Sequence, residues 1–143
     1  HIAGNACDMK EFADTTFDLV HSNSVVEHVG GWNRAKQFAS EVRRVADALF
    51  IQTPNFWFPI EPHYVMPFLH WLPRTTRETL MLRIPMGHKG RRAVSLDAAI
   101  AEVDDMPRLL DYRAYKLLFP DCQIVRERFC LLTKSFIAIR KPR

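Results

Sequence analysis

A short apolar run followed by small polar and ionisable residues constrains the fold of this chain most strongly. Residues 17–20 read Phe-Asp-Leu-Val, and their aromatic and β-branched side chains favour a strand, which we expect to be buried on both faces. His21–Ser24 then leave the strand at its carboxyl end, where open α/β sheets bind their ligands. The pattern therefore predicts a strand whose polar end faces a ligand site.

A second strand with a polar end follows an amphipathic segment. Apolar residues fall at helical spacing over residues 32–46, which predicts a helix with one buried face. Leu49–Ile51 is the next apolar run, and Thr53–Asn55 closes it with polar residues. We expect the two strands to be neighbours, so that Ser22 and Asn55 lie near one crevice.

Composition excludes several classes of function. The net charge is only +4, from 20 basic and 16 acidic residues, and the basic residues are scattered, so we expect no nucleic-acid partner. The three cysteines lack the spacing of a metal site, so we expect no metal and a reducing, cytoplasmic location. The chain starts at His1, without Met, a basic region or an apolar core, so we expect no signal peptide.

Residues 56–73 form an unusual segment rich in aromatic residues and proline. Glu61, two histidines and the prolines interrupt it, so it predicts no membrane span, which needs about 20 mostly apolar residues. One interpretation is a packed lid or core segment. A second is the wall of a substrate pocket, with Glu61, His63 and Tyr64 as polar groups among aromatic ones. A third is shallow contact with a membrane surface to reach a lipid-linked acceptor.

The rest of the chain predicts short helices and a final hairpin. Capping residues and apolar spacing predict three helices: 74–83 with Thr75 or Thr76 as its cap, 96–103 after Ser95, and a helix capped by Asp111 that ends at Phe119. Gln123–Arg128 and Leu131–Ile139 alternate polar and apolar residues, which predicts two antiparallel strands. Cys122 and Cys130 are expected to be free thiols.

The order of these motifs resembles that of the class I S-adenosylmethionine-dependent methyltransferases. The matching motifs are Gly4-Asn5-Ala6, Asp14–Thr16, Phe17–Val20, Glu27-His28-Val29, Glu41–Val45, Gln52–Asn55, Leu118–Asp121 and Thr133–Ala138. They span nearly the whole chain. The resemblance implies an α/β fold, a Rossmann-like methyltransferase sheet that ends in an antiparallel hairpin.

The resemblance also implies how S-adenosylmethionine would be bound. The family usually has Asp where this chain has Asn5, and that residue accepts a hydrogen bond from the adenine amino group; Asn5 keeps an acceptor oxygen. The amide of Ala6 would meet the adenine ring. Ser22 and Asn23 match the segment that holds the methionine portion of the cofactor.

One family motif is absent from these residues. None of the five glycines has the Gly-x-Gly-x-Gly spacing of the loop that lets the backbone approach the cofactor. The chain therefore resembles the C-terminal part of a methyltransferase domain, incomplete at the N-terminus, with a variable helical insertion at about 74–110. We expect the strand at 17–20 to have an exposed edge, covered by further N-terminal sequence or by self-association.

The leading interpretation is methyl transfer to a small-molecule or lipid-linked acceptor, with this segment inactive when alone. His28 and His63 are the candidates for a catalytic base, and Asn55, Glu61 and Tyr64 are the candidates for acceptor binding. The alternative is a non-catalytic, methyltransferase-like binding or scaffolding module. A nucleotide-binding oxidoreductase is a third interpretation, against which the lack of a dinucleotide fingerprint argues.

Overall fold

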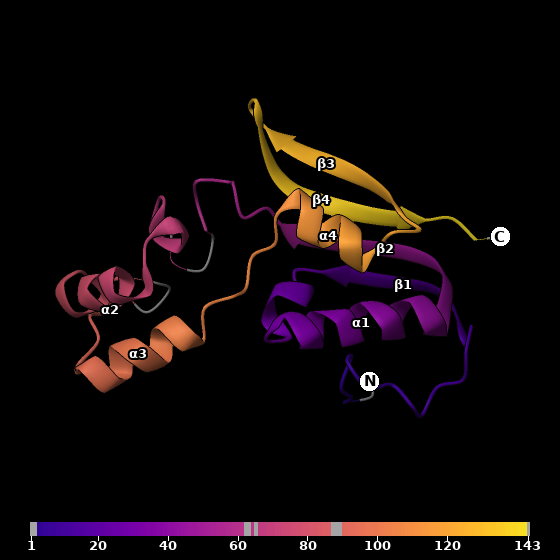
Figure 1. Cartoon of the computed structure of the whole chain (residues 1–143), viewed down its shortest axis with the longest axis horizontal. Helices are drawn as coiled ribbons and strands as arrows, with labels where there is room; N and C mark the ends of the chain where they lie inside the picture. Colours follow the sequence, from indigo (N-terminus) through magenta and orange to yellow (C-terminus); the bar gives the residue numbers. More distant parts are fainter. Residues whose placement is uncertain (1–2, 62–63, 65, 87–89, 143) are drawn as a thin grey trace. The chain divides into compact units, whose positions relative to one another are not determined.

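The computed structural model describes residues 3–61, 64, 66–86 and 90–142, which divide into two compact units (Figure 1). His1–Trp57 and Pro107–Arg143 form the first unit, and Phe58–Met106 form the second. The predicted insertion at about 74–110 overlaps the second unit. Each unit is described separately below.

An open sheet of four strands forms the centre of the first unit (Figure 1). In chain order the strands are β1 (Phe17–Asn23), β2 (Ala46–Pro54), β3 (Gln123–Phe129) and β4 (Leu132–Arg140). In space they follow the order β1-β2-β4-β3, with β1 and β2 parallel and both other pairs antiparallel. The predicted Rossmann-like sheet with a final antiparallel hairpin is confirmed.

Two helices, α1 (Trp32–Val45) and α4 (Tyr112–Leu118), pack on the same face of this sheet. Their buried residues join one core with alternate residues of β2 and β4: Phe38, Val42, Tyr115, Leu118, Leu49, Ile51, Phe136 and Ala138. Asp111 Oδ1 accepts the backbone N–H of Ala114 at 2.8 Å, which confirms the predicted cap of α4.

The Tyr115 hydroxyl fastens α4 to the sheet. It donates a hydrogen bond to the Ile51 carbonyl and accepts one from the Ala138 N–H at 3.2 Å. Burial raises the pKa of Tyr115 above its ordinary value. Because Ile51 and Ala138 face each other across β2 and β4, one side chain bridges both strands.

The expectation that residues 17–20 are buried on both faces is wrong. Leu19 is 54% exposed and Phe17 is 38% exposed. The reason is non-local: β1 is an edge strand of the described sheet, and both helices of this unit lie on the opposite face from Leu19. The sequence pattern shows which side chains of the strand are apolar. It does not show which of these side chains the neighbouring elements cover.

The second unit contains η2 (Leu69–Trp71), α2 (Arg74–Arg83) and α3 (Leu96–Asp104). Met81, Ala99 and Val103 form its small core. The prediction for α3 is confirmed, because Ser95 Oγ accepts the Ala98 N–H at 3.1 Å. The predicted threonine cap of α2 is wrong: Pro73 occupies the cap position, so both threonines fall inside the first turn.

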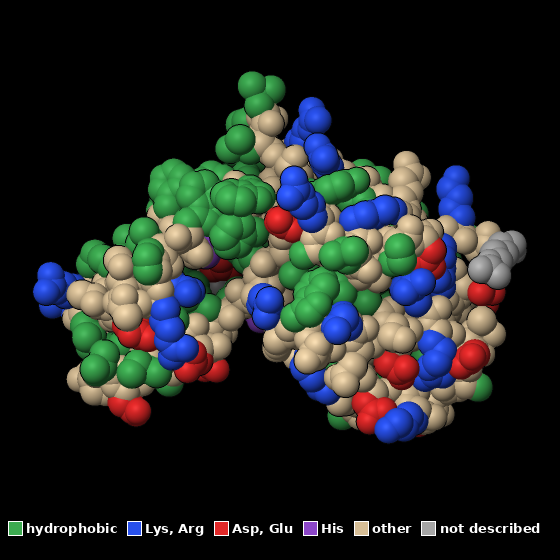
Figure 2. All heavy atoms as spheres, in the orientation of Figure 1, with side chains coloured by type: hydrophobic (Ala, Val, Ile, Leu, Met, Phe, Trp, Pro, Cys, Tyr) green, Lys and Arg blue, Asp and Glu red, His purple; other side chains and the backbone are tan. Residues whose placement is uncertain are grey.

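The cysteines, the candidate membrane and metal sites, and the surface charge complete the description. Cys7 and Cys122 are buried free thiols, and Cys130 is an exposed one. Within the described ranges, no helix combines the length and apolarity needed to cross a membrane, and no group of three His, Cys, Asp or Glu residues could hold a metal ion. Figure 2 shows Lys and Arg side chains interspersed with acidic ones on the face drawn.

Candidate functional site

The carboxyl ends of β1 and β2 lie at one edge of the sheet. The two strands are parallel, with Leu19 opposite Ala48 and Asn23 opposite Gln52. The single turn η1 (Val26–His28) follows β1 and leads to the start of α1, so α1 begins at this same edge. We call it the carboxyl edge.

The segment before β1 reaches the carboxyl edge as well. Arg34, in the first turn of α1, donates to Asn5 Oδ1 at 3.1 Å. At the other end of α1, the Thr15 N–H donates to the Arg44 carbonyl at 2.9 Å. The segment therefore runs along α1, and Asn5 lies beside the helix turn that begins at the carboxyl edge.

Asn5 and Ala6 were both predicted to contact adenine, but they differ in the hydrogen-bonding groups that they leave available to a ligand. Asn5 Oδ1 accepts from Arg34 and also from the Cys7 N–H at 3.1 Å, so its oxygen is engaged within the chain. The Ala6 N–H makes no hydrogen bond with any residue that the structure describes. The Ala6 donor is thus available to a ligand, and Asn5 holds the turn that presents it.

Buried polar groups gather at the end of β1. Ser22, predicted to hold the methionine portion, is 8% exposed, and its Oγ has no hydrogen-bond partner in the described chain. Asn23, its predicted companion, is exposed. Glu27 is 1% exposed; its Oε2 accepts from Thr53 Oγ1 at 2.9 Å, whereas its Oε1 lacks a partner among the described residues. Because unsatisfied buried polar atoms are rare, Ser22 and Glu27 make this region a candidate site.

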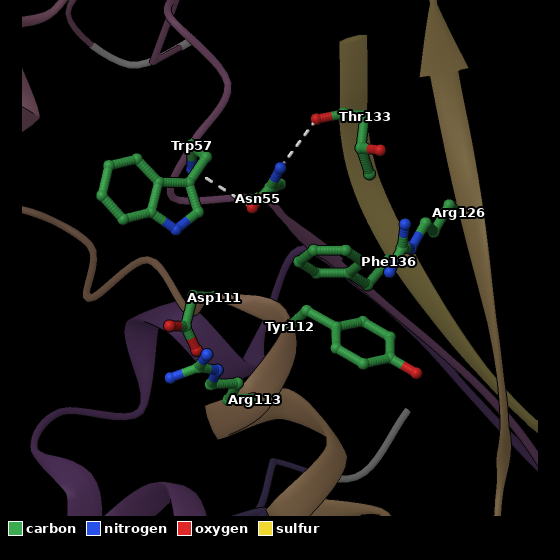
Figure 3. A pocket seen from close by; sticks show the side chains of 8 residues that line it. All are labelled: Asn55, Trp57, Asp111, Tyr112, Arg113, Arg126, Thr133 and Phe136. Atoms are coloured by element: carbon green, nitrogen blue, oxygen red, sulfur yellow. Dashed lines mark hydrogen bonds between the residues drawn. The ribbon is translucent and has the colours of Figure 1, made fainter.

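A cavity of about 280 Å³ lies where β2 ends (Figure 3). We call it the α4 cavity, because the start of α4 forms part of its wall. Its lining residues come from four places in the chain: Asn55 and Trp57 after β2, Asp111, Tyr112 and Arg113 at the start of α4, Arg126 on β3, and Thr133 and Phe136 on β4. All of them belong to the first unit.

Asn55, a predicted acceptor-binding residue, lines this cavity but is held by the chain itself. It is 6% exposed. Its Nδ2 donates to the Thr133 carbonyl at 2.8 Å, and its Oδ1 accepts the Trp57 N–H at 3.1 Å. Asn55 therefore shapes the wall of the cavity with both ends of its amide.

Trp57 belongs to the 56–73 segment, one interpretation of which was a pocket wall, but the charged and other aromatic side chains of the α4 cavity were not predicted as site residues. The Arg126 guanidinium carbon lies 4.7 Å from the centroid of the Tyr112 ring, in a cation–π arrangement. The Tyr112 and Phe136 ring centroids are 5.8 Å apart. Arg126 lies opposite Phe136 in the hairpin. The predicted hairpin could therefore have indicated that these two residues are neighbours, but only with its register known.

The remaining predicted residues lie elsewhere. His28 is exposed on η1 and does not line the α4 cavity. His63 lies outside the described residues. Glu61 and Tyr64 belong to the second unit, where Glu61 Oε2 accepts the Tyr64 N–H at 3.0 Å and the Tyr64 hydroxyl donates to the Glu102 carbonyl at 3.1 Å. Burial, with nearby acidic residues, raises the pKa of Tyr64.

Comparisons with known proteins agree with this geometry. Residues 1–48 match a family model described as "Methyltransferase domain". No curated protein matches the chain. The matched residues contain the turn at Asn5 and Ala6, β1, η1, α1 and the start of β2, and thus the cofactor-side residues predicted from the sequence.

Three solved structures share the fold. PH0226 protein from Pyrococcus horikoshii is 16% identical with a TM-score of 0.53, over 99% of this chain and 58% of its own. A possible exported protein from Bordetella parapertussis is 12% identical with a TM-score of 0.51, over 98% and 43%. A candidate Zn-dependent alcohol dehydrogenase from Rhodobacter sphaeroides is 9% identical with a TM-score of 0.52, over 100% and 65%.

At these identities the structures show the fold alone, and this chain spans less than two thirds of each of them. The match to a methyltransferase family model covers residues 1–48, about a third of this chain. Residues 1–48 are therefore similar to a methyltransferase domain, and the chain shares its fold with these solved structures.

Proposed function

We propose that this domain transfers a methyl group from S-adenosylmethionine to a small-molecule or lipid-linked acceptor. The observation that carries the proposal is the buried Ser22 hydroxyl, which lacks a partner in the described chain and lies at the carboxyl edge. It falls within the residues that match a methyltransferase family. A bound ligand would supply the hydrogen-bond partner that this buried hydroxyl lacks.

The residues on the cofactor side fit this ligand. The Ala6 N–H is an available donor for the adenine ring, and Ser22 would bind the methionine portion. When bound, S-adenosylmethionine supplies an electrophilic methyl group on a positively charged sulfur. The chain's own residues then orient the ligand, keep water out and hold the acceptor in line, since alignment accounts for most of the rate gain in such a reaction.

The acceptor side is the α4 cavity, which opens where β2 ends. Its rigid wall, fixed by Asn55, would position the nucleophile of the acceptor. His28, exposed on η1 and outside the lining of the α4 cavity, is the candidate base predicted from the sequence, and it would reach the acceptor through a water. We place the reaction in the cytoplasm, because the free thiols suit a reducing compartment.

Titration calorimetry of the full-length protein with S-adenosylmethionine and S-adenosylhomocysteine tests the proposal. Saturable binding of both ligands is expected. The 143-residue chain alone is expected to show no turnover, because it carries no Gly-x-Gly-x-Gly loop. If the folded full-length protein gives no binding heat with either ligand, methyl transfer is excluded and a binding or scaffolding module is favoured.

A further inference from the structure

The α4 cavity contains two arginines from different elements, Arg113 in the first turn of α4 and Arg126 on β3. Neither forms an ion pair with a residue in the described part of the chain. The only carboxylate in the lining is Asp111, so two arginines against one aspartate leave the lining with a net charge of +1. One oxygen of Asp111 already accepts the Ala114 N–H at the helix start.

The Arg126 side chain is exposed and has an aromatic partner. Its guanidinium lies over the Tyr112 ring at 4.7 Å, and Tyr112 in turn packs edge-on against Phe136. This contact places the guanidinium over the ring and leaves its N–H groups to hydrogen-bond. A planar guanidinium binds a carboxylate through two parallel hydrogen bonds, which a more flexible lysine ammonium cannot do.

Flat aromatic surface borders the same cavity. Trp57 is 61% exposed and Tyr112 is 38% exposed, whereas Phe136 is buried. Figure 3 shows Tyr112, Phe136 and Arg126 grouped together, with Trp57 apart from them beyond Asn55. A flat ligand placed here would remove aromatic surface from water. The volume of about 280 Å³ suits a compact ligand, because it is near the lower end for small-molecule sites.

We propose that the α4 cavity binds a small aromatic carboxylate, with the carboxylate on Arg126 and the ring against the aromatic lining. We further propose that this carboxylate is the methyl acceptor, which rests on the proposed function. The binding site itself does not depend on that function. A carboxylate is favoured over a phosphate because the lining pairs its cations with flat apolar surface, which inorganic phosphate has no means to cover.

Benzoate, benzamide and inorganic phosphate are suitable probes for the full-length protein, by titration calorimetry at fixed ionic strength. Benzoate should bind saturably, and benzamide, which has the same ring and no charge, should bind about ten-fold more weakly or worse. Phosphate should bind more weakly than benzoate. Equal affinity for benzoate and benzamide would overturn the proposal, as would tighter binding of phosphate.

Variants on β3 locate the binding. Arg126→Ala should weaken benzoate binding about ten-fold or more, and Arg126→Lys should weaken it less, because the charge remains but the planar fork is lost. Arg128→Ala is the matched control: this arginine is exposed on the same strand and does not line the cavity, so benzoate affinity should not change. Equal affinities for Arg126→Ala and the wild type contradict the proposal, provided both melt at similar temperatures.

A parallel titration with S-adenosylhomocysteine separates this inference from the proposed function. Benzoate binding without S-adenosylhomocysteine binding would support the carboxylate site and refute the methyltransferase. S-adenosylhomocysteine binding without benzoate binding would support the methyltransferase and refute the carboxylate site. Each proposal can therefore fail alone.

Discussion

The side-chain amide of Asn55 donates a hydrogen bond of 2.8 Å to the backbone carbonyl of Thr133. Asn55 directly follows β2, and Thr133 lies near the start of β4, so this bond joins two strand ends that border the α4 cavity. The backbone reinforces it, because the Asn55 N–H donates to the Lys134 carbonyl at 2.9 Å. The position of one buried side chain thus sets the wall of the candidate acceptor site.

Asn55→Asp should lower the free energy of unfolding by about 1–3 kcal/mol, because a carboxylate cannot donate to the Thr133 carbonyl and both oxygens would be buried together. Urea unfolding measures the change. Asn33→Asp makes the same substitution at an exposed position in α1 and should change stability by less than about 0.5 kcal/mol. Equal effects at the two positions would show that the Asn55 bond has no structural role.

Ser22→Ala should stabilise the unliganded protein by up to about 1 kcal/mol, because it removes a buried hydroxyl without a partner in the described chain. The same variant should bind S-adenosylhomocysteine more weakly. Ser135→Ala is the matched control: this buried serine donates to Glu127, so its loss should destabilise the protein by about 1 kcal/mol without changing affinity. A loss of stability in Ser22→Ala with unchanged affinity would contradict a ligand-binding role.

Glu41 makes stability depend on pH. Arg44 donates two hydrogen bonds to its carboxylate, at 3.1 and 2.9 Å, and the Met9 N–H donates one at 2.7 Å. The Arg44 hydrogen bonds are the main cause of a pKa below the ordinary value of 4.5. A carboxyl with a lowered pKa in the folded state stabilises the protein above its ordinary pKa and loses this effect as the pH falls through the lowered value.

Glu41→Gln should therefore reduce stability at neutral pH and flatten the decline in stability below about pH 4.5. Unfolding temperatures measured from pH 7 to pH 3 for both proteins check this result. Two curves that stay parallel over the whole range would mean that Glu41 does not contribute to the acid sensitivity of the fold.

Self-association along β1 is a further prediction, because its outer edge has no strand partner in the described sheet and Leu19 is 54% exposed. The 143-residue chain should form dimers or larger species in sedimentation experiments. Leu19→Lys should shift it toward monomer, whereas Leu131→Lys, at a 93% exposed hairpin position, should not. A monomer at all concentrations, or an equal response to both substitutions, would contradict association through β1.

Local chemistry allowed the sequence to predict much of the framework. The caps at Ser95 and Asp111 follow from side chains that bond the backbone three residues on, and the predicted helices and hairpin begin and end within a few residues of the observed ones. The placement of polar residues at the carboxyl ends of β1 and β2 also followed from the pattern, and the parallel pairing confirms it.

What the sequence could not predict depends on distant neighbours. The exposure of Leu19 depends on which elements cover one face of the sheet. The contact of Arg126 with Tyr112 depends on hairpin register and on how α4 packs. Glu27 was recognisable as an acidic residue between Val26 and His28, but only the fold shows that Thr53 is its partner.

A crystal structure of the full-length protein grown with S-adenosylhomocysteine tests the central claim most directly. We predict ligand density at the carboxyl edge, with the Ala6 N–H donating a hydrogen bond to the ligand and Ser22 Oγ forming a second one with it. Density for the ligand at another edge of the sheet would contradict the account. So would crystals at saturating ligand in which this edge is filled by side chains of the protein itself.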